Sequence, residues 1–157
     1  MKRAWILMFL AVIVLGVVVI MVARRGLGPT SHSDLSQPRI YAYRDWQSVG
    51  VQVNEGDLIR LRAQGTWLYT PGEYHGPEGH RRYPAPSYYP VSGVAGGVLL
   101  GRIGEDGPPF IVGRGGTFYA DRAGLLYLRI NDDILSDNDG YVTVEVSVTS
   151  PTPTPSR

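Results

Sequence analysis

The chain has 157 residues, 43% of them hydrophobic, with 15 Lys and Arg against 14 Asp and Glu. This length suits one globular domain. The nearly balanced charge, with no basic block interleaved with aromatic residues, excludes the usual electrostatic footprint of nucleic-acid binding, so we expect no nucleic-acid partner. The chain has no cysteine, which excludes thiol catalysis, disulfides and cysteine-bound zinc. Its 20 Gly, 12 Pro and 10 Tyr favour a turn-rich β protein.

The sequence begins with an apolar segment, Ala4–Ala23, whose 20 residues carry no charge. As an α-helix it would rise about 1.5 Å per residue and cover the roughly 30 Å hydrocarbon core of a bilayer. The letters before Arg24 are MVA, which place a bulky residue where signal-peptide cleavage favours a small one. We therefore expect residues 1–25 to form an uncleaved single-pass membrane anchor, with a cleaved signal peptide as the alternative. The remaining chain is expected to be extracytoplasmic.

Two segments without apolar periodicity flank the rest of the chain. Residues 26–39, GLGPTSHSDLSQPR, are rich in Gly, Ser and Pro and are typical of a flexible linker. Residues 150–157, SPTPTPSR, alternate Pro with Thr or Ser and predict an extended, unpacked tail. The folded domain is therefore expected to span residues 40–149.

Apolar and polar residues alternate through most of this domain, as they do in strands with one buried face. In LIRLRAQ the apolar Ile59, Leu61 and Ala63 alternate with Arg60 and Arg62. In YVTVEVSV four valines, at positions 142, 144, 146 and 148, share one face. Shorter strands are predicted at residues 51–53, 98–103, 110–112, 117–119 and 125–130. Short strands without helices to cover a parallel sheet predict an all-β fold, a jelly-roll-type antiparallel β-sandwich.

One long polar and aromatic segment, Tyr69–Pro90, interrupts this alternation with the letters YTPGEYHGPEGHRRYPAPSYYP. Irregular segments of this length in a compact domain are usually functional or disordered. We expect His75 and His80 to be exposed loop residues. Four tyrosines and the preceding Trp67 are expected mainly to pack the segment onto the sandwich, whereas Tyr83 is left open between packing and ligand contact. The four are Tyr69, Tyr74, Tyr88 and Tyr89.

The common catalytic motifs are missing from the sequence. The three histidines lack the H-E-x-x-H spacing of zinc proteases, and there is neither a G-x-S-x-G elbow nor a Walker loop. The glycine clusters GRIGEDG and GRGG do not connect a strand to a helix, as phosphate binding requires, and are typical of hairpin turns. We therefore expect a protein that is not an enzyme.

The acidic run, Asn131–Gly140, reads NDDILSDNDG and holds four aspartates and two asparagines between two predicted strands. Turns also prefer Asp, Asn and Gly, so a solvated turn is one interpretation. A calcium site is the other, because Ca2+ takes about six to eight oxygen ligands from carboxylates, amides and carbonyls. The run is not an EF-hand, since Leu135 occupies a ligand position and no helices flank it. Repulsion among the carboxylates favours a bound cation.

Three segments in chain order resemble the galactophilic PA-I-type bacterial lectins. They are VNEGDLIRLRAQGTWLYTPGEYHGPEGHRRYP, GGVLLGRIG and LYLRINDDILSDNDGYVTVEV. The likeness covers nearly all of the predicted domain and includes the ungapped stretch YTPGEYHGPEG and the acidic run. The resemblance implies a calcium-dependent jelly-roll sandwich in which the ion bridges the protein and two hydroxyl groups of a sugar.

The resemblance also implies the residues of this site. It assigns Ca2+ to the side chains of Asp132, Asp137 and Asn138, the backbone carbonyl of Tyr69 and a carbonyl near Leu135. It assigns sugar contacts to Pro71, Tyr83, Asp132, Asp133, Asp137 and Asn138.

Three departures from the family pattern concern the calcium ligands and the sugar contacts. The acidic run is shorter than in the family, which leaves Asp132 and Asp133 as alternatives for the first ligand. Asp137 replaces an asparagine and adds a negative charge. Tyr83 and Pro86 replace the family's sugar-contacting His and Gln, and Pro86 has no hydrogen-bond donor.

The expected function is that of a membrane-anchored, calcium-dependent carbohydrate-binding module for a galactoside or another vicinal-diol sugar. The alternative is a structural or adhesion domain that keeps the fold and does not bind sugar.

Overall fold

A computed structural model describes residues 37–70 and 72–151. The predicted anchor at residues 1–25, the linker up to residue 36, Pro71 and the tail from residue 152 lie outside the described residues. Within residues 37–70 and 72–151, no helix has the length and apolar character that spanning a bilayer requires.

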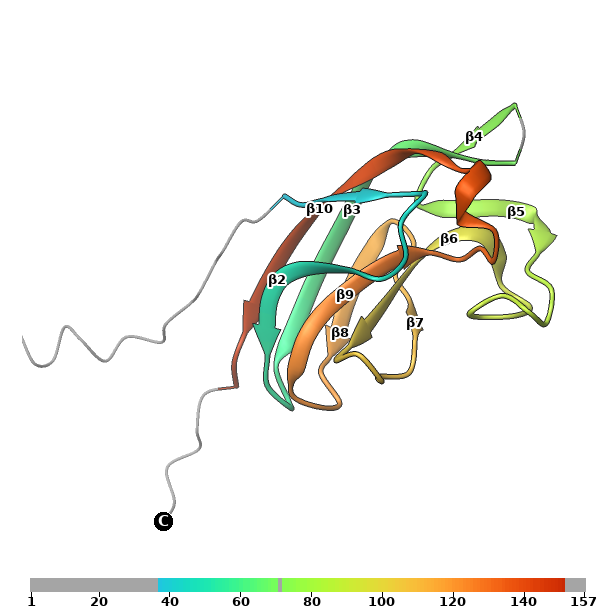
Figure 1. The fold of residues 1–157 in the computed structure, drawn as a ribbon. Coiled ribbons are helices and arrows are strands. Elements are labelled where there is room, and N and C mark those ends of the chain that lie inside the picture. Colours follow the sequence, from blue (N-terminus) through green and yellow to red (C-terminus); the bar gives the residue numbers. More distant parts are fainter. Residues whose placement is uncertain (1–36, 71, 152–157) are drawn as a thin grey trace, which may run out of the picture. The chain divides into compact units, whose positions relative to one another are not determined.

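Two five-stranded antiparallel sheets make up the described part of the chain (Figure 1). The first sheet has the order β1 (Arg39–Tyr41), β10 (Asp139–Thr149), β3 (Leu58–Thr70) and β4 (Glu73–His75), and β8 (Gly115–Tyr119) also pairs with β3. The second sheet has the order β2 (Gln47–Val53), β9 (Gly124–Ile130), β6 (Ala95–Ile103) and β5 (Glu78–Pro84), and β7 (Phe110–Ile111) also pairs with β6. The prediction of an all-β, antiparallel fold is confirmed.

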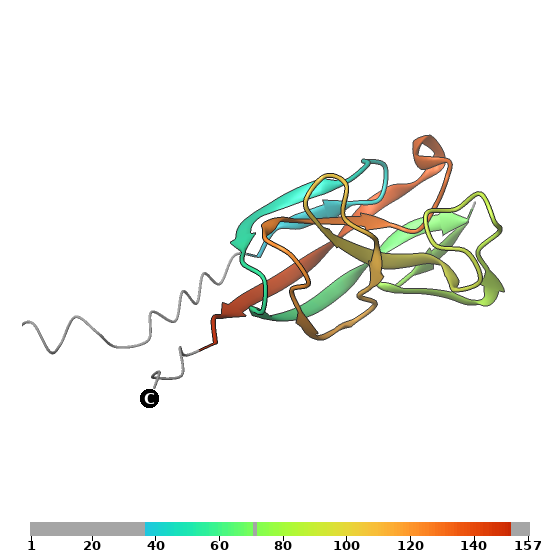
Figure 2. The same cartoon turned by 90° about the horizontal axis from the view of Figure 1, so that it is seen from below.

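One apolar core is shared by the two sheets. Figure 2 shows the strands of both sheets from below. In β3 the residues Ile59, Leu61 and Ala63 are buried whereas the alternating arginines are exposed, as the sequence pattern predicts. The valines of β10 pair with this strand, with Val144 opposite Ala63. The second sheet contributes seven residues that are 0 to 5% exposed: Val49, Val53, Leu99, Ile103, Leu126, Leu128 and Ile130. Full burial of such side chains stabilises the fold by about 1.5–3 kcal/mol each.

The predicted Tyr69–Pro90 loop is largely strand, so that prediction is wrong. β3 continues to Thr70, and the segment also contains β4 and β5. Both strands are short or exposed on much of their length, so they lack the apolar alternation by which half-buried strands are recognised. β1 begins at Arg39, the last residue of the predicted linker.

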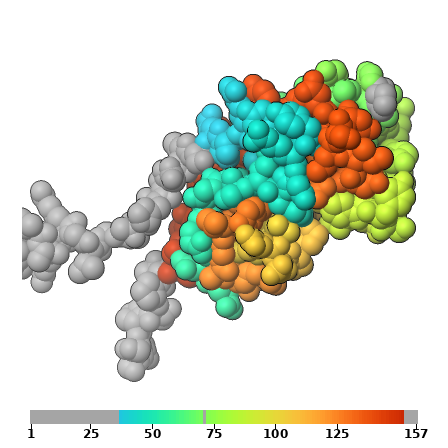
Figure 3. All heavy atoms as spheres, in the orientation of Figure 1, coloured from blue at the N-terminus to red at the C-terminus, as the bar shows by residue number. Residues whose placement is uncertain are grey.

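One end of the domain gathers β4, β5 and the acidic run (Figure 1). Within the acidic run, Leu135–Asp137 form a single turn of 3-10 helix, η1. On the surface the acidic run lies beside the segment that contains β5 (Figure 3). Trp67 helps to fix this end, because its buried indole N–H donates to the Gly97 carbonyl at 3.0 Å and so connects β3 to β6.

Candidate functional site

A pocket of about 450 Å³ opens at this end of the domain. Its walls come from the end of β3, from β4 and β5, from the loop that follows β5 and from the acidic run. The lining residues are Tyr69, Thr70, Glu73, His80, Arg82, Tyr83, Tyr88, Tyr89, Asp132, Asp133, Ile134 and Asp137. Its volume falls in the range of about 300–1,000 Å³ that is typical of small-molecule sites.

Asp132 and Asn138 form a buried polar pair beside this pocket. Asp132 is 3% exposed and Asn138 is 6% exposed. The Asn138 amide donates to the Asp132 carboxylate at 2.7 Å and to the Ile134 carbonyl at 3.3 Å. The Oδ1 atom of Asn138 is buried and has no hydrogen-bond partner among the described residues. A buried acceptor of this kind costs free energy unless a donor or a cation reaches it.

Burial raises the pKa of the Asp132 carboxyl, whereas the hydrogen bonds from Asn138 and Tyr89 lower it by a smaller amount. The cause is the loss of water around the ionised carboxylate. The metal-free site therefore disfavours the negative charge on Asp132. A divalent cation would reverse this preference, because an opposite charge nearby favours the ionised form.

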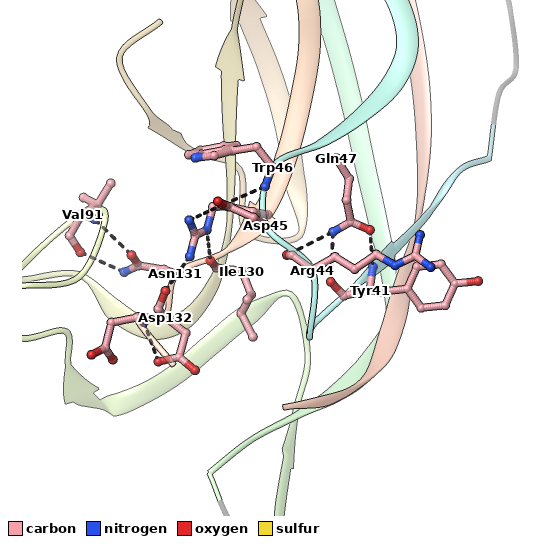
Figure 4. Close-up of polar contacts among 11 residues, drawn as sticks. Tyr41, Arg44, Asp45, Trp46, Gln47, Val91, Ile130, Asn131 and Asp132 are labelled. Atoms are coloured by element: carbon pink, nitrogen blue, oxygen red, sulfur yellow. Dashed lines mark hydrogen bonds and ion pairs between the residues drawn. The ribbon is translucent and has the colours of Figure 1, made fainter. Parts of the chain in front are cut away.

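The backbone of Asp132 is held by the guanidinium of Arg129, which is 9% exposed. Arg129 donates through Nη2 to the Asp132 carbonyl at 2.7 Å and through Nε to the Ile130 carbonyl at 3.0 Å, while Nη1 pairs with Asp45. Dashed lines in Figure 4 mark polar contacts at Asp45, Ile130 and Asp132. The planar fork of an arginine suits this role, since it presents several donors in a fixed geometry.

Replacing Arg129 with Met keeps much of the side-chain bulk and removes every side-chain donor. The Asp132 carbonyl then loses this partner, and the Ile130 carbonyl keeps only the Asp132 N–H at 3.1 Å. We expect R129M to lower the free energy of unfolding by about 2–4 kcal/mol, measured by urea denaturation, because hydrogen bonds from charged groups contribute about 1.5–3 kcal/mol each. The matched control is R122M, whose arginine pairs on the surface with the adjacent Asp121 and should leave stability unchanged. Equal losses in the two variants would contradict the role given to Arg129.

Asn131 ties the acidic run to the loop after β5. It is fully buried, accepts from the Val91 N–H at 3.0 Å and donates to the Val91 carbonyl at 2.8 Å (Figure 4). These two hydrogen bonds hold the wall that carries Tyr88 and Tyr89 against the wall that carries Asp132.

The backbone of Tyr69 lies at an irregularity in the pairing of β3 with β4. Leu68 pairs with Tyr74 and Thr70 pairs with Glu73, which leaves Tyr69 without a partner on β4. The register of β3 with β10 ends at Leu68. The extra residue of such a bulge is left out of the ladder. The Tyr69 backbone therefore differs from the rest of β3 in not being paired into either neighbouring strand.

The ring of Tyr69 is buried against β6, and its hydroxyl lies 3.1 Å from that of Tyr89. Gly97 has a φ of +71°, and a Cβ there would lie 2.6 Å from Cγ of Tyr69, so only glycine fits. Burial raises the pKa of Tyr69 and of Tyr89. Both phenols therefore remain neutral and add no negative charge to a pocket that already holds several carboxylates.

The structure brings most of the predicted site residues to this one pocket. Asp133, Asp137 and Tyr83 line it together with Tyr69 and Asp132. The predicted carbonyl ligand near Leu135 belongs to η1, where the Leu135 carbonyl accepts from the Asn138 N–H at 3.4 Å. Pro71 lies outside the described residues. Pro86 does not line the pocket.

Sequence reasoning missed several residues of the pocket, namely Thr70, Glu73, His80, Arg82, Tyr88, Tyr89 and Ile134. The expectation that His75 and His80 are exposed was wrong: both are half-buried and lie in β4 and β5. Tyr74 and Tyr88 do not pack the segment onto the domain, since they are 61% and 66% exposed. The signal that could have found this wall is the density of aromatic and charged residues between Tyr69 and Pro90.

Eight chains of solved structures are similar to this chain. One of them is the N-terminal domain of EclA, described as a PllA-like lectin, with 21% identity and a TM-score of 0.57. The match covers 75% of this chain and 99% of that domain. The chain has a lectin-like fold. No protein-family model and no curated protein matches it.

Several oxygen donors gather at the pocket, where a hard cation could be held. The Asn138 side chain contacts the Asp132 carboxylate through its amide nitrogen and has an unpartnered Oδ1 atom, while Asp133 and Asp137 line the adjoining pocket. Carboxylate, amide and carbonyl oxygens are the ligands of Ca2+. These residues fit a calcium ion. Among the residues that line the pocket, Arg82 is the one arginine or lysine, so little positive charge opposes a cation there.

Proposed function

We propose that the protein is a calcium-dependent, non-enzymatic carbohydrate-binding module. The ligand we propose is a galactoside or another sugar with vicinal hydroxyls. Calcium would supply a fixed divalent charge that makes sugar hydroxyls competitive ligands against water. The residues of this chain would hold the ion, orient the sugar and exclude solvent from its apolar face.

The observation that carries this proposal is the buried Asp132–Asn138 pair with its orphaned Asn138 Oδ1 atom. A solvated turn would not bury an aspartate to 3% exposure and leave an amide oxygen without a donor. A cation bound to this pair would satisfy the Asn138 amide oxygen and compensate the Asp132 carboxylate charge. Between the two candidates for the first ligand, burial favours Asp132, because Asp133 is exposed.

The remaining protein ligands we propose are Asp137, the Leu135 carbonyl and the Tyr69 carbonyl. The bulge at Tyr69 supports the last of these, since a residue outside both ladders has a carbonyl that strand pairing does not use. Tyr69 and the acidic run also meet in the same pocket although they are distant in the sequence.

The aromatic residues of the pocket support a sugar as the ligand. Tyr83 is 44% exposed and Tyr88 is 66% exposed, and both line the pocket. A tyrosine offers an apolar ring face with a polar hydroxyl at its edge, which matches the apolar C–H face and the hydroxyl groups of a sugar. Tyr83 would take the place of the histidine expected from the lectin pattern.

We further propose that the two sheets form a jelly-roll-type sandwich and that residues 1–25 anchor it in a membrane on the extracytoplasmic side. The support for the anchor is the uncharged Ala4–Ala23 segment. This arrangement would present the sugar pocket to the cell exterior on a Gly-, Ser- and Pro-rich linker.

The experiment is a calorimetric titration of methyl galactoside into the full chain in a detergent without a sugar headgroup. We expect binding in millimolar calcium and none after chelation. Y83A should weaken it by about two- to tenfold, since aromatic contacts of this kind contribute about 0.5–1.5 kcal/mol. The matched control is Y74A, whose tyrosine is 61% exposed and does not line the pocket. Binding that survives chelation, or an equal loss in Y74A, would contradict the proposed site.

A further inference from the structure

A second group of potential metal ligands lies at the rim of the pocket, formed by Glu73, His75 and His80. The Nε2 atoms of both histidines are 3.4 Å from Oε2 of Glu73. All three ligand atoms lie within 4.8 Å of one another. None of these residues belongs to the oxygen-donor group around Asp132.

The local fold explains why these side chains converge. Glu73 and His75 are two residues apart in β4, so their side chains point to the same face of the strand. A tight connection follows, in which the Gly79 N–H donates to the Gly76 carbonyl at 2.9 Å. It returns the chain into β5 and brings His80 back toward His75, with ring centroids 4.5 Å apart.

Hydrogen bonding within the group does not account for its geometry. The Nε2 atom of His75 is buried and has no hydrogen-bond partner among the described residues. Its 3.4 Å separation from Glu73 exceeds the usual hydrogen-bond range of about 2.7–3.2 Å. A buried ring nitrogen left unpaired is costly, so the arrangement calls for a further partner.

Two of the three separations match the edges of a tetrahedral metal site. Zinc bonds to histidine nitrogen and carboxylate oxygen at about 2.0–2.2 Å, which places neighbouring ligand atoms about 3.3–3.6 Å apart. Both Glu73–histidine separations, at 3.4 Å, lie in this interval. Two imidazoles and one carboxylate suit zinc rather than calcium, which takes oxygen ligands.

We propose that Glu73, His75 and His80 bind a zinc-class divalent ion, with a fourth position open to the solvent or to a bound ligand. Two features support the open position: the Glu73 side chain is 58% exposed, and Glu73 and His80 both line the pocket. The ion would fasten β4 to β5 and place a second metal on the wall that these two strands form.

The test is a zinc titration by calorimetry on the full chain in detergent, purified without a histidine tag and saturated with calcium. We expect one zinc ion per chain with micromolar or tighter affinity. E73Q and H80N should each weaken binding by at least about tenfold, since even the loss of an outer-shell partner of a metal ligand costs about 10–100-fold. Both residues are partly exposed, and thermal unfolding without zinc should show that each variant still folds.

Two controls separate this site from other ligands. H32N changes the third histidine of the chain, and D132N removes the proposed calcium ligand; neither should alter zinc affinity. Absence of zinc binding in the wild type would overturn the proposal and leave a histidine–carboxylate contact only. Unchanged affinity in E73Q and H80N, or loss of zinc in D132N, would overturn it as well. The D132N control also keeps a failure of the calcium site distinct from a failure of this one.

Discussion

Calcium at about a hundred times its dissociation constant is expected to raise the free energy of unfolding by about 2.7 kcal/mol, because it binds the folded chain only. For a domain of this size the gain corresponds to a rise in melting temperature of roughly 10 °C. The effect should be seen by thermal unfolding of the full chain in detergent, with chelator and then with millimolar calcium. It is the direct consequence of the cation compensating the buried Asp132 carboxylate.

The D132N variant sharpens this test. Burial raises the pKa of Asp132, so the ionised form destabilises the metal-free fold at neutral pH. D132N should therefore be at least as stable as the wild type in chelator and should show no calcium shift. D139N removes a charge from the same acidic run at an exposed position outside the pocket and should keep the full shift. A calcium shift that persists in D132N, or disappears in D139N, would place the ion elsewhere.

Replacing Asn138 with Ala is expected to abolish calcium-dependent sugar binding, with a loss of more than about a hundredfold in affinity. The substitution removes the unpartnered Oδ1 atom, which we propose as a ligand, and also the donor to the Asp132 carboxylate at 2.7 Å. Changes to residues around a metal ligand commonly lower metal affinity by roughly 10–100-fold even when the ligand itself is kept. Sugar affinity should be measured by calorimetry in saturating calcium.

Two further variants help to explain a loss of sugar binding in N138A. N138D restores an oxygen donor at the same position and should recover calcium binding, so a misfolded N138A is distinguished from one that lacks only the ligand. N54A changes an exposed asparagine in the turn before β3 and should bind sugar as the wild type does. Undiminished sugar binding in N138A would contradict the assignment of Asn138 to the site.

The strands β3 and β10 were predictable because a strand with one buried face alternates apolar and polar residues in its own sequence. Ile59, Leu61 and Ala63 are buried as expected, and Val142, Val144 and Val146 are buried beside them on the neighbouring strand of the same sheet. β4 and β5 were not predictable in this way. Their side chains face the pocket or the solvent, so neither strand carries an apolar face.

The acidic run was recognised by its composition. The residues that hold it in place, Arg129 and Asn131, were not recognised. Arg129 reaches Asp45 across 84 residues of sequence, and Asn131 reaches Val91 across 40 residues. Such long-range contacts leave no periodic pattern in either segment. The convergence of Glu73, His75 and His80 was missed for a related reason, because it depends on a turn in a segment expected to be an irregular loop.

The most direct test of the central claim is a glycan array probed with the full chain, once in millimolar calcium and once in chelator. A calcium-dependent carbohydrate-binding module should bind a set of glycans with terminal galactose or another vicinal-diol sugar, and all of these signals should vanish in chelator. An array that stays blank in calcium, or shows the same signals without it, would contradict the account and favour a structural or adhesion domain.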